Sequence, residues 1–303
     1  MIKSVNKRAF TMLELVFVIV IMGIIGKFGT EFIAQAYKSF IYTKVNNQLQ
    51  SDSLAAVEFV SKRLQYRIKD STIAREDDNT STSLSDYSAG TANIIEWIGA
   101  DVEGFRGDTG FYWSGVIDLT ASDATKLVSP GTTTNNITPL IQTLSGDNTK
   151  SIDDAALYFV GSQVLSANPW GWSGAINDQV TDAMHPIKDN PFNLSHLLPN
   201  TVPTFSGTDA YEFYQLAWTA YAVGIDDWNA VTKSGTLKLW YAYQPWNGET
   251  RFDGKTSVIM ENVSSFRFIA QSSLVKIQVC VKSDIIDGDN NGGYSLCKEK
   301  TVF

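Results

Sequence analysis

An unbroken apolar segment near the N-terminus constrains this chain more than any other feature. From Phe10 to Gly26 the only ionisable side chain is that of Glu14, and Lys27 ends the segment. A helix over these residues is about 25 Å long, close to the hydrocarbon thickness of a bilayer. A carboxylate within such a helix is costly in lipid, so Glu14 requires an explanation.

Basic residues predict the orientation of this segment. Lys3, Lys7 and Arg8 precede it, and no acidic residue lies among them. The positive-inside rule therefore places the N-terminus in the cytoplasm and the chain beyond the segment across the membrane. Two simpler interpretations remain open. The segment could be a secretory signal peptide cleaved near Ala34-Gln35-Ala36, or a plain anchor that tolerates Glu14 near the interface.

The helical pattern continues well past the apolar segment. No proline interrupts it, since the first proline of the chain is Pro130. Apolar residues recur at mostly three- and four-residue spacing, at Val45, Leu49, Leu54, Val57, Val60, Leu64 and Ile68. We predict one long helix over about residues 10–70. Its first half, residues 10–28, would lie in the membrane, and residues 29–70 would be amphipathic and pack on a core.

The remainder of the chain has the pattern of β-structure. Residues 71–92 are rich in Ser, Thr and Asp and are predicted to form a solvated loop. Aromatic and β-branched segments bounded by turn residues then predict strands. The predicted strands are Asn93–Ile98, Gly110–Leu119, Ala155–Val160, Glu212–Val223, Thr236–Tyr243, Val258–Ala270, Leu274–Lys282 and Tyr294–Phe303. The predicted fold class is α+β: a long helix followed by an antiparallel β-rich head over residues 71–303, with residues 120–210 the least readable.

The first residues resemble a known processing signal. KRAFTMLELVFVIVIMGIIG resembles the type IV prepilin signature, in which a short basic leader precedes Phe-Thr-x-x-Glu and an apolar stretch. The resemblance implies a pilin-like fold, a leader at residues 1–9, and cleavage between Ala9 and Phe10 by a prepilin peptidase with N-methylation of Phe10. Glu14 becomes the fifth mature residue, as in the family. Ala9 replaces the usual glycine, and Glu31 replaces a common helix-kinking proline.

The resemblance also supplies a role for Glu14 in assembly. Cleavage creates a free amine at Phe10, and the Glu14 carboxylate of a neighbouring subunit can pair with it. Subunits packed out of register would leave both charges unpaired in a medium of low dielectric constant. We therefore expect Glu14 to set the register between subunits.

The C-terminal third resembles the larger minor pseudopilins, in particular the J-type subunit of type II secretion. The resemblance rests on YEFYQLAWTAYAV, LKLWYAYQPWNGETRF, VIMENVSSFRFIA and LVKIQVCV, in that order. It implies a non-enzymatic minor subunit in the inner membrane with a periplasmic head, able to join a filament. The implied partners are the prepilin peptidase, other pilins, membrane lipid and the assembly platform.

A hairpin is predicted at the C-terminus. If its turn is centred between Gly288 and Asp289, Cys280 faces Cys297, and an oxidising periplasm favours a disulfide. Such a bridge would contribute about 3 kcal/mol in the chain-entropy model. The alternative is a pair of reduced, buried thiols.

The loop of this hairpin contains half of a calcium-binding motif. Asp287, Asp289 and Asn291 match D-x-[DN]-x-[DN]-G, but Lys298 occupies the position of the bidentate glutamate. A calcium ion at these three residues and an ordinary turn are the two interpretations. No cofactor is otherwise required by the sequence.

Composition and motifs weigh against several other functions. The net charge of −8 disfavours direct nucleic-acid binding. No paired catalytic carboxylates or nucleophile motif can be identified, so we expect no enzymatic activity.

His185 and His196 are expected in loops or at the surface. A membrane-anchored sugar-binding protein or enzyme is the alternative, and among filament systems secretion, pilus and DNA-uptake roles all stay open.

The tryptophans are expected mostly in the core. Those considered are Trp97, Trp113, Trp170, Trp172, Trp218 and Trp240. An exposed cluster within residues 165–175 is the alternative.

Overall fold

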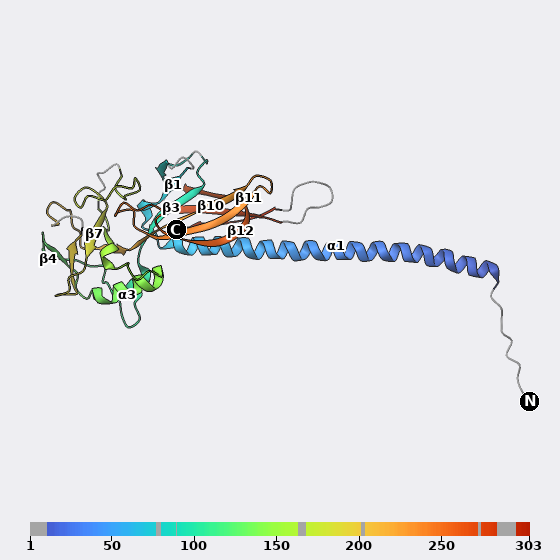
Figure 1. Ribbon diagram of the computed structural model, residues 1–303, viewed down its shortest axis with the longest axis horizontal. Coiled ribbons are helices and arrows are strands. Elements are labelled where there is room, and N and C mark those ends of the chain that lie inside the picture. The colour runs from blue at the N-terminus through green and yellow to red at the C-terminus, as the bar shows by residue number, and fades with distance from the viewer. Residues whose placement is uncertain are drawn as a thin grey trace, which may run out of the picture. The chain divides into compact units, whose positions relative to one another are not determined.

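The computed structural model describes residues 11–76, 80–88, 90–162, 168–200, 204–271, 274–283 and 295–303. The chain divides into two compact units, Met1–Ser51 and Asp52–Phe303, and the second is called the head unit below. One long helix, α1 (Met12–Gln65), belongs to both, and antiparallel sheet dominates the head unit (Figure 1). The predicted α+β class is confirmed.

Helix α1 ends at Gln65, about five residues before the predicted end. Beyond it Arg67 forms an antiparallel bridge with Gly99, and the amide of Ile68 donates to the Ile98 carbonyl at 2.9 Å. The chain therefore leaves the helix in order to pair with a strand. The helix continues without interruption through Glu31.

Within the head unit, the end of α1 packs on the larger sheet. Val57, Val60 and Leu64 are at most 1% exposed. At the border of this contact, Lys300 Nζ lies 2.6 Å from Glu58 Oε2. The burial of one face of this helical segment agrees with its three- and four-residue apolar spacing.

The larger sheet has eight antiparallel strands in the order β14-β13-β12-β11-β10-β3-β1-β2. They are β1 (Ile73–Arg75), β2 (Ser81–Ser83), β3 (Ile94–Gly99), β10 (Thr219–Asn229), β11 (Ser234–Tyr243), β12 (Lys255–Gln271), β13 (Leu274–Lys282) and β14 (Ser295–Val302). Because β3 pairs directly with β10, residues 100–218 form an insertion between two neighbouring strands.

The insertion builds a second, six-stranded sheet in the order β4-β5-β8-β7-β6-β9. Its strands are β4 (Asp118–Asp123), β5 (Lys126–Val128), β6 (Ala156–Phe159), β7 (Met184–Lys188), β8 (His196–Pro199) and β9 (Tyr214–Ala217). The short helices are η1 (Lys69–Ser71), α2 (Val102–Arg106), α3 (Thr134–Ser145) and η2 (Ile152–Asp154).

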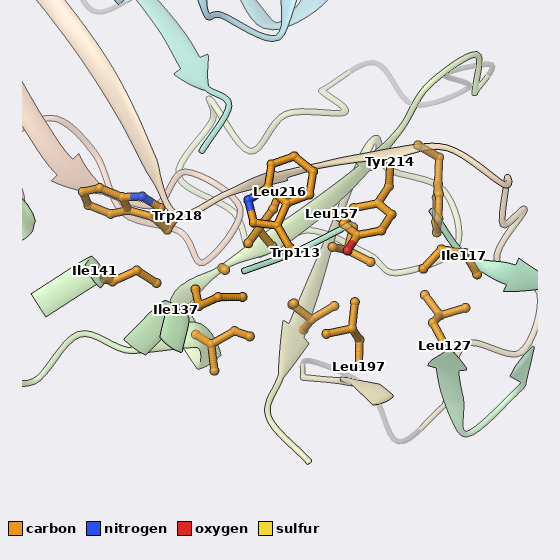
Figure 2. Close-up of a cluster of buried hydrophobic side chains, with 14 of the residues drawn as sticks. Trp113, Ile117, Leu127, Ile137, Ile141, Leu157, Leu197, Tyr214, Leu216 and Trp218 are labelled. Atoms are coloured by element: carbon orange, nitrogen blue, oxygen red, sulfur yellow. The ribbon is translucent and has the colours of Figure 1, made fainter. Parts of the chain in front are cut away.

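The insertion has its own apolar core (Figure 2). Ile137 and Ile141 of α3 are fully buried against it, and Leu157 of β6 lies at its centre. Trp113 and Tyr214 contact each other with ring centroids 5.5 Å apart. Ala156 and Met184 of the second sheet belong to another apolar core, which they share with Trp240 and Tyr243 of the larger sheet.

Most of the predicted strands are present, and three predictions are wrong. No strand covers residues 110–117, where Gly110 and Gly115 adopt positive φ, and β4 begins only at Asp118. The predicted strand Glu212–Val223 is two strands, because the chain passes from the second sheet to the first at Trp218. Residues 71–92 are not simply a solvated loop, since β1 within them is buried.

The C-terminal hairpin is confirmed in its register. β13 and β14 pair so that Cys280 faces Cys297, and the two residues form a disulfide with a Cα–Cα distance of 4.0 Å. The turn of this hairpin, with Asp287, Asp289 and Asn291 of the calcium prediction, lies outside the described residues.

Candidate functional site: the apolar helix surface and the buried polar groups of the head

The first half of α1 presents an apolar surface on every side. Each large hydrophobic side chain from Met12 to Phe40 is between 41% and 86% exposed, and we call this set the apolar helix surface. The most apolar window of the helix has a mean hydropathy of 2.2 and no buried residue. The helix is thus long and apolar enough to cross a membrane. An apolar surface of this extent requires lipid or other apolar helices around it.

Glu14 lies in the first turn of this helix. Its amide donates to the Thr11 carbonyl at 3.0 Å, and its side chain is exposed. Among the described residues no ion pair involves Glu14. The two predicted processing residues, Ala9 and Phe10, lie outside the described part of the chain. The structure therefore leaves the Glu14 carboxylate available at the apolar helix surface.

The one hydroxyl close behind the apolar window is satisfied within the helix. Thr30 Oγ1 donates to the carbonyls of Gly26 at 3.1 Å and Lys27 at 2.9 Å. Such back-bonding keeps a polar group compatible with an apolar environment.

A buried charge cluster lies in the head unit. Arg75 of β1 donates to Glu96 of β3 through Nε at 2.7 Å and Nη2 at 3.3 Å. Arg251 donates to the same carboxylate at 3.3 Å, and the Tyr243 hydroxyl of β11 donates at 3.4 Å. Burial, with the nearby Glu96 carboxylate second, raises the pKa of Tyr243 well above its ordinary value. The cluster joins β1, β3 and β11 through one carboxylate, so its role is to hold these strands together.

A second polar group lies where the insertion leaves the larger sheet. Asp101 caps α2 by accepting from the Gly104 amide at 3.1 Å, and its other oxygen accepts from Trp113 Nε1 at 3.0 Å. Burial raises the pKa of Asp101 to about 6, against the opposing effect of these hydrogen bonds. The carboxylate fastens the start of the insertion to its core.

The two histidines occupy different environments. His185 was expected in a loop or at the surface, which is wrong: it is 3% exposed within β7. Its Nδ1 lies 3.0 Å from the Gln179 carbonyl, so Nδ1 carries the hydrogen, and burial lowers the pKa of the ring to about 4. His196 is partly exposed in β8 with Nε2 at 3.1 Å from Asn193 Nδ2. Within the described ranges no group of three His, Cys, Asp or Glu side chains is arranged to hold a metal.

The tryptophan prediction is confirmed. All six of the tryptophans considered are at most 7% exposed, including Trp170 and Trp172. The alternative, an exposed cluster within residues 165–175, is therefore wrong, because both tryptophans of that segment are buried and their ring surfaces are not available for sugar stacking.

Sequence reasoning missed Glu96, Arg75 and Asp101. Glu96 had a local signal, because it is the only charged residue in the strand Ile94–Gly99. A charge within an otherwise apolar strand predicts a buried partner. Nothing in the sequence identifies which arginine that partner is.

Comparison of the chain with models of known protein families, with curated proteins and with solved structures finds no match.

Proposed function

We propose that this chain is a minor subunit of a type IV filament system, that is, a minor pilin or pseudopilin with a structural role. One observation carries the proposal. A single helix has an exposed apolar first half with a carboxylate in its first turn, and its last turns pack into an antiparallel β-rich head unit. The prepilin-like sequence KRAFTMLEL at its start supports the same conclusion.

The subunit is held in the inner membrane before assembly. The apolar helix surface crosses the bilayer once, the basic N-terminus stays in the cytoplasm, and the head unit lies in the periplasm. The disulfide between Cys280 and Cys297 supports this side of the membrane for the head, because disulfides persist in oxidising compartments.

Assembly replaces lipid around the helix by the helices of sibling subunits. The prepilin peptidase removes residues 1–9 and the Phe10 amine becomes available. Glu14 of one subunit then pairs with the Phe10 amine of its neighbour, while the apolar helix surface supplies the packing. The pair sets the axial register, since any other register leaves two charges unpaired in an apolar interior.

The system served by the filament is secretion, pilus formation or DNA uptake. The net charge of −8 makes direct DNA binding the least favourable role of the head. Its size, due to the insertion at residues 100–218, suits a minor subunit at a filament tip, where the head has fewer lateral neighbours.

The proposal is tested by the mature N-terminus. The full-length gene is expressed with and without a prepilin peptidase, and the membrane-bound protein is analysed by intact mass spectrometry. The expected product begins at Phe10 and carries one methyl group only when the peptidase is present. An intact Met1 in both samples, or a chain that begins at Tyr37, would overturn the proposal. An Ala9→Gly variant is the matched control for slow processing caused by the unusual residue before the cut.

A further inference from the structure

The larger sheet opens beyond the N-terminal end of β11. β11 pairs with β12 only as far as Gly235 opposite Val263, and from Ser265 to Gln271 the ladder partner of β12 is β13. Asn262 adopts a positive φ of 57°, and the register shifts between Val263 and Ser265, so β12 changes direction at this point. Beyond this bulge β13 pairs with one edge of β12, and the opposite edge, on the side of β11, has no strand beside it among the described residues.

Strand geometry shows which backbone groups face this open edge. The Cα–Cα distance of 4.0 Å marks Cys280 and Cys297 as a pair without direct backbone hydrogen bonds. The backbone of Cys280 is therefore directed to its partner on β12, Ser265. By alternation, Arg267 and Ile269 also bond to β13, whereas the N–H and C=O groups of Phe266 and Phe268 point to the open edge. No backbone hydrogen bond between either phenylalanine and a described loop is present.

A groove runs along this edge. It has a volume of about 540 Å³ and lies between Ser264–Phe268 of β12 and a wall that includes Ile225 and Trp228 of β10. Trp228 is 54% exposed. Beside the groove, the tilted rings of Phe268 and Tyr87 contact each other with their centroids 6.2 Å apart, and the Tyr87 hydroxyl accepts from the amide of Ala92, which lines the groove. These contacts within the head unit hold the Ala92 side of the groove in place.

Among the described residues that line the groove, Arg267 is the only charged one. No ion pair joins Arg267 to another described residue, in a chain whose net charge is −8. The occupant that complements these features has backbone groups to pair with a strand edge, apolar side chains for Trp228, and a carboxylate for Arg267.

We propose that this groove binds an extended segment of a partner protein, added as a strand to β12 and carrying an acidic side chain opposite Arg267. Strand addition uses main-chain hydrogen bonds for affinity and side-chain contacts for selection. The backbone groups of Phe266 and Phe268 that face the open edge supply the main-chain hydrogen bonds. The side chains of Arg267 and Trp228 supply the selective contacts. The inference concerns the head unit alone and does not depend on the proposed filament role.

Hydrogen exchange of the free protein tests the open edge directly. In the full-length chain in detergent micelles, the amides of Phe266 and Phe268 should exchange at least about tenfold faster than those of Arg267 and Ile269, which bond to β13. Equal protection of all four amides would mean that the edge is already covered, and would overturn the proposal.

A synthetic peptide tests the binding. The probe is a capped peptide of alternating valine and threonine with one central glutamate, titrated by calorimetry against the full-length chain. We expect saturable binding and slower exchange of the Phe266 and Phe268 amides. Replacing the central glutamate by lysine, or methylating the peptide's edge-facing amides, should each weaken binding by about tenfold or more. No binding at millimolar peptide, or equal binding of the methylated peptide, would overturn the proposal.

Variants locate the contact on this chain. Arg267→Glu should weaken the glutamate peptide about tenfold and strengthen the lysine peptide relative to it. Lys188→Glu makes the same charge change on the exposed end of β7 in the other sheet, and should change affinity by less than about twofold. Equal effects of the two variants would contradict the assignment. A homodimer in sedimentation that Arg267→Glu abolishes would also overturn it, because a second copy of this chain would then be the occupant.

Discussion

Arg75 and Glu96 form a two-pronged ion pair inside the head unit, with side chains that are only 7% and 2% exposed. The guanidinium of Arg251 meets the same carboxylate from a loop that follows β11. One carboxylate therefore faces two guanidinium groups in a site that water scarcely reaches. The pair joins β1 to β3, the strand from which the insertion departs.

Removal of this carboxylate should destabilise the head more than removal of either arginine. Glu96→Gln leaves two buried guanidinium groups without their shared anion and should lower the free energy of unfolding by about 3–5 kcal/mol. Arg75→Gln leaves Glu96 with Arg251 and should cost less. Urea unfolding followed by near-UV circular dichroism measures both. The control is Lys126→Gln, which breaks an exposed pair with Asp123 and should cost less than about 1 kcal/mol. A larger cost for Arg75→Gln than for Glu96→Gln would contradict the arrangement.

The disulfide should stabilise the head by restricting its unfolded state. Cys280 and Cys297 are 17 residues apart, so the chain-entropy model gives about 3 kcal/mol. The double variant Cys280→Ser with Cys297→Ser should unfold at a lower urea concentration than the oxidised protein. Dithiothreitol should lower the stability of the wild type and leave that of the double variant unchanged. An effect of the reductant on the double variant would show that it acts elsewhere.

Asp101 and His185 should give opposite pH dependences that offset each other. Burial raises the pKa of Asp101 from 3.8 to about 6, so its stabilising contribution is complete below about pH 4 and is lost as pH rises through 6. Burial lowers the pKa of His185 from 6.5 to about 4. Its contribution is therefore complete above about pH 6.5 and is lost as pH falls towards 4. Each effect is at most about 3 kcal/mol.

Single variants should reveal each effect. With Asp101→Asn, the free energy of unfolding should fall more steeply than in the wild type as pH decreases from 6.5 to 4. With His185→Gln, it should instead rise relative to the wild type over the same interval. Urea titrations at several pH values measure these slopes. Identical slopes for both variants and the wild type would mean that neither group keeps its shifted pKa in the folded state.

The elements with a single regular pattern were predictable from the sequence. α1 and the hairpin of β13 and β14 are long and periodic, and the position of a strong turn signal was enough to place Cys280 opposite Cys297. The strand that changes sheets at Trp218 was not predictable, because apolar alternation continues through the junction. Helix α3 in the insertion was missed as well, since Pro139 within it weakens a helical pattern.

Of the candidate functional features, one could be predicted from the sequence and one could not. Glu14 could be identified because its carboxylate interrupts an apolar segment, which is a local contradiction visible in the sequence. The open edge of β12 could not be identified in this way, because it depends on where β11 stops pairing with β12. The point at which β11 stops pairing with β12 and the bulge at Asn262 depend on the exact register between these strands, which the apolar pattern of neither strand specifies.

Glu14 should matter for assembly and not for membrane insertion. Glu14→Leu removes the carboxylate from the first turn of α1 and makes the helix more apolar, so the protein should still enter the membrane and should be processed at Phe10. It should fail to enter filaments, or should enter at least about tenfold less, because the Phe10 amine of the neighbouring subunit lacks its partner. Sheared filament fractions compared with membrane fractions by immunoblot measure this ratio. Glu31→Leu is the matched control, since Glu31 is an exposed carboxylate on the same helix beyond the most apolar window. Equal incorporation of the Glu14 variant and the wild type would show that the glutamate does not set the register.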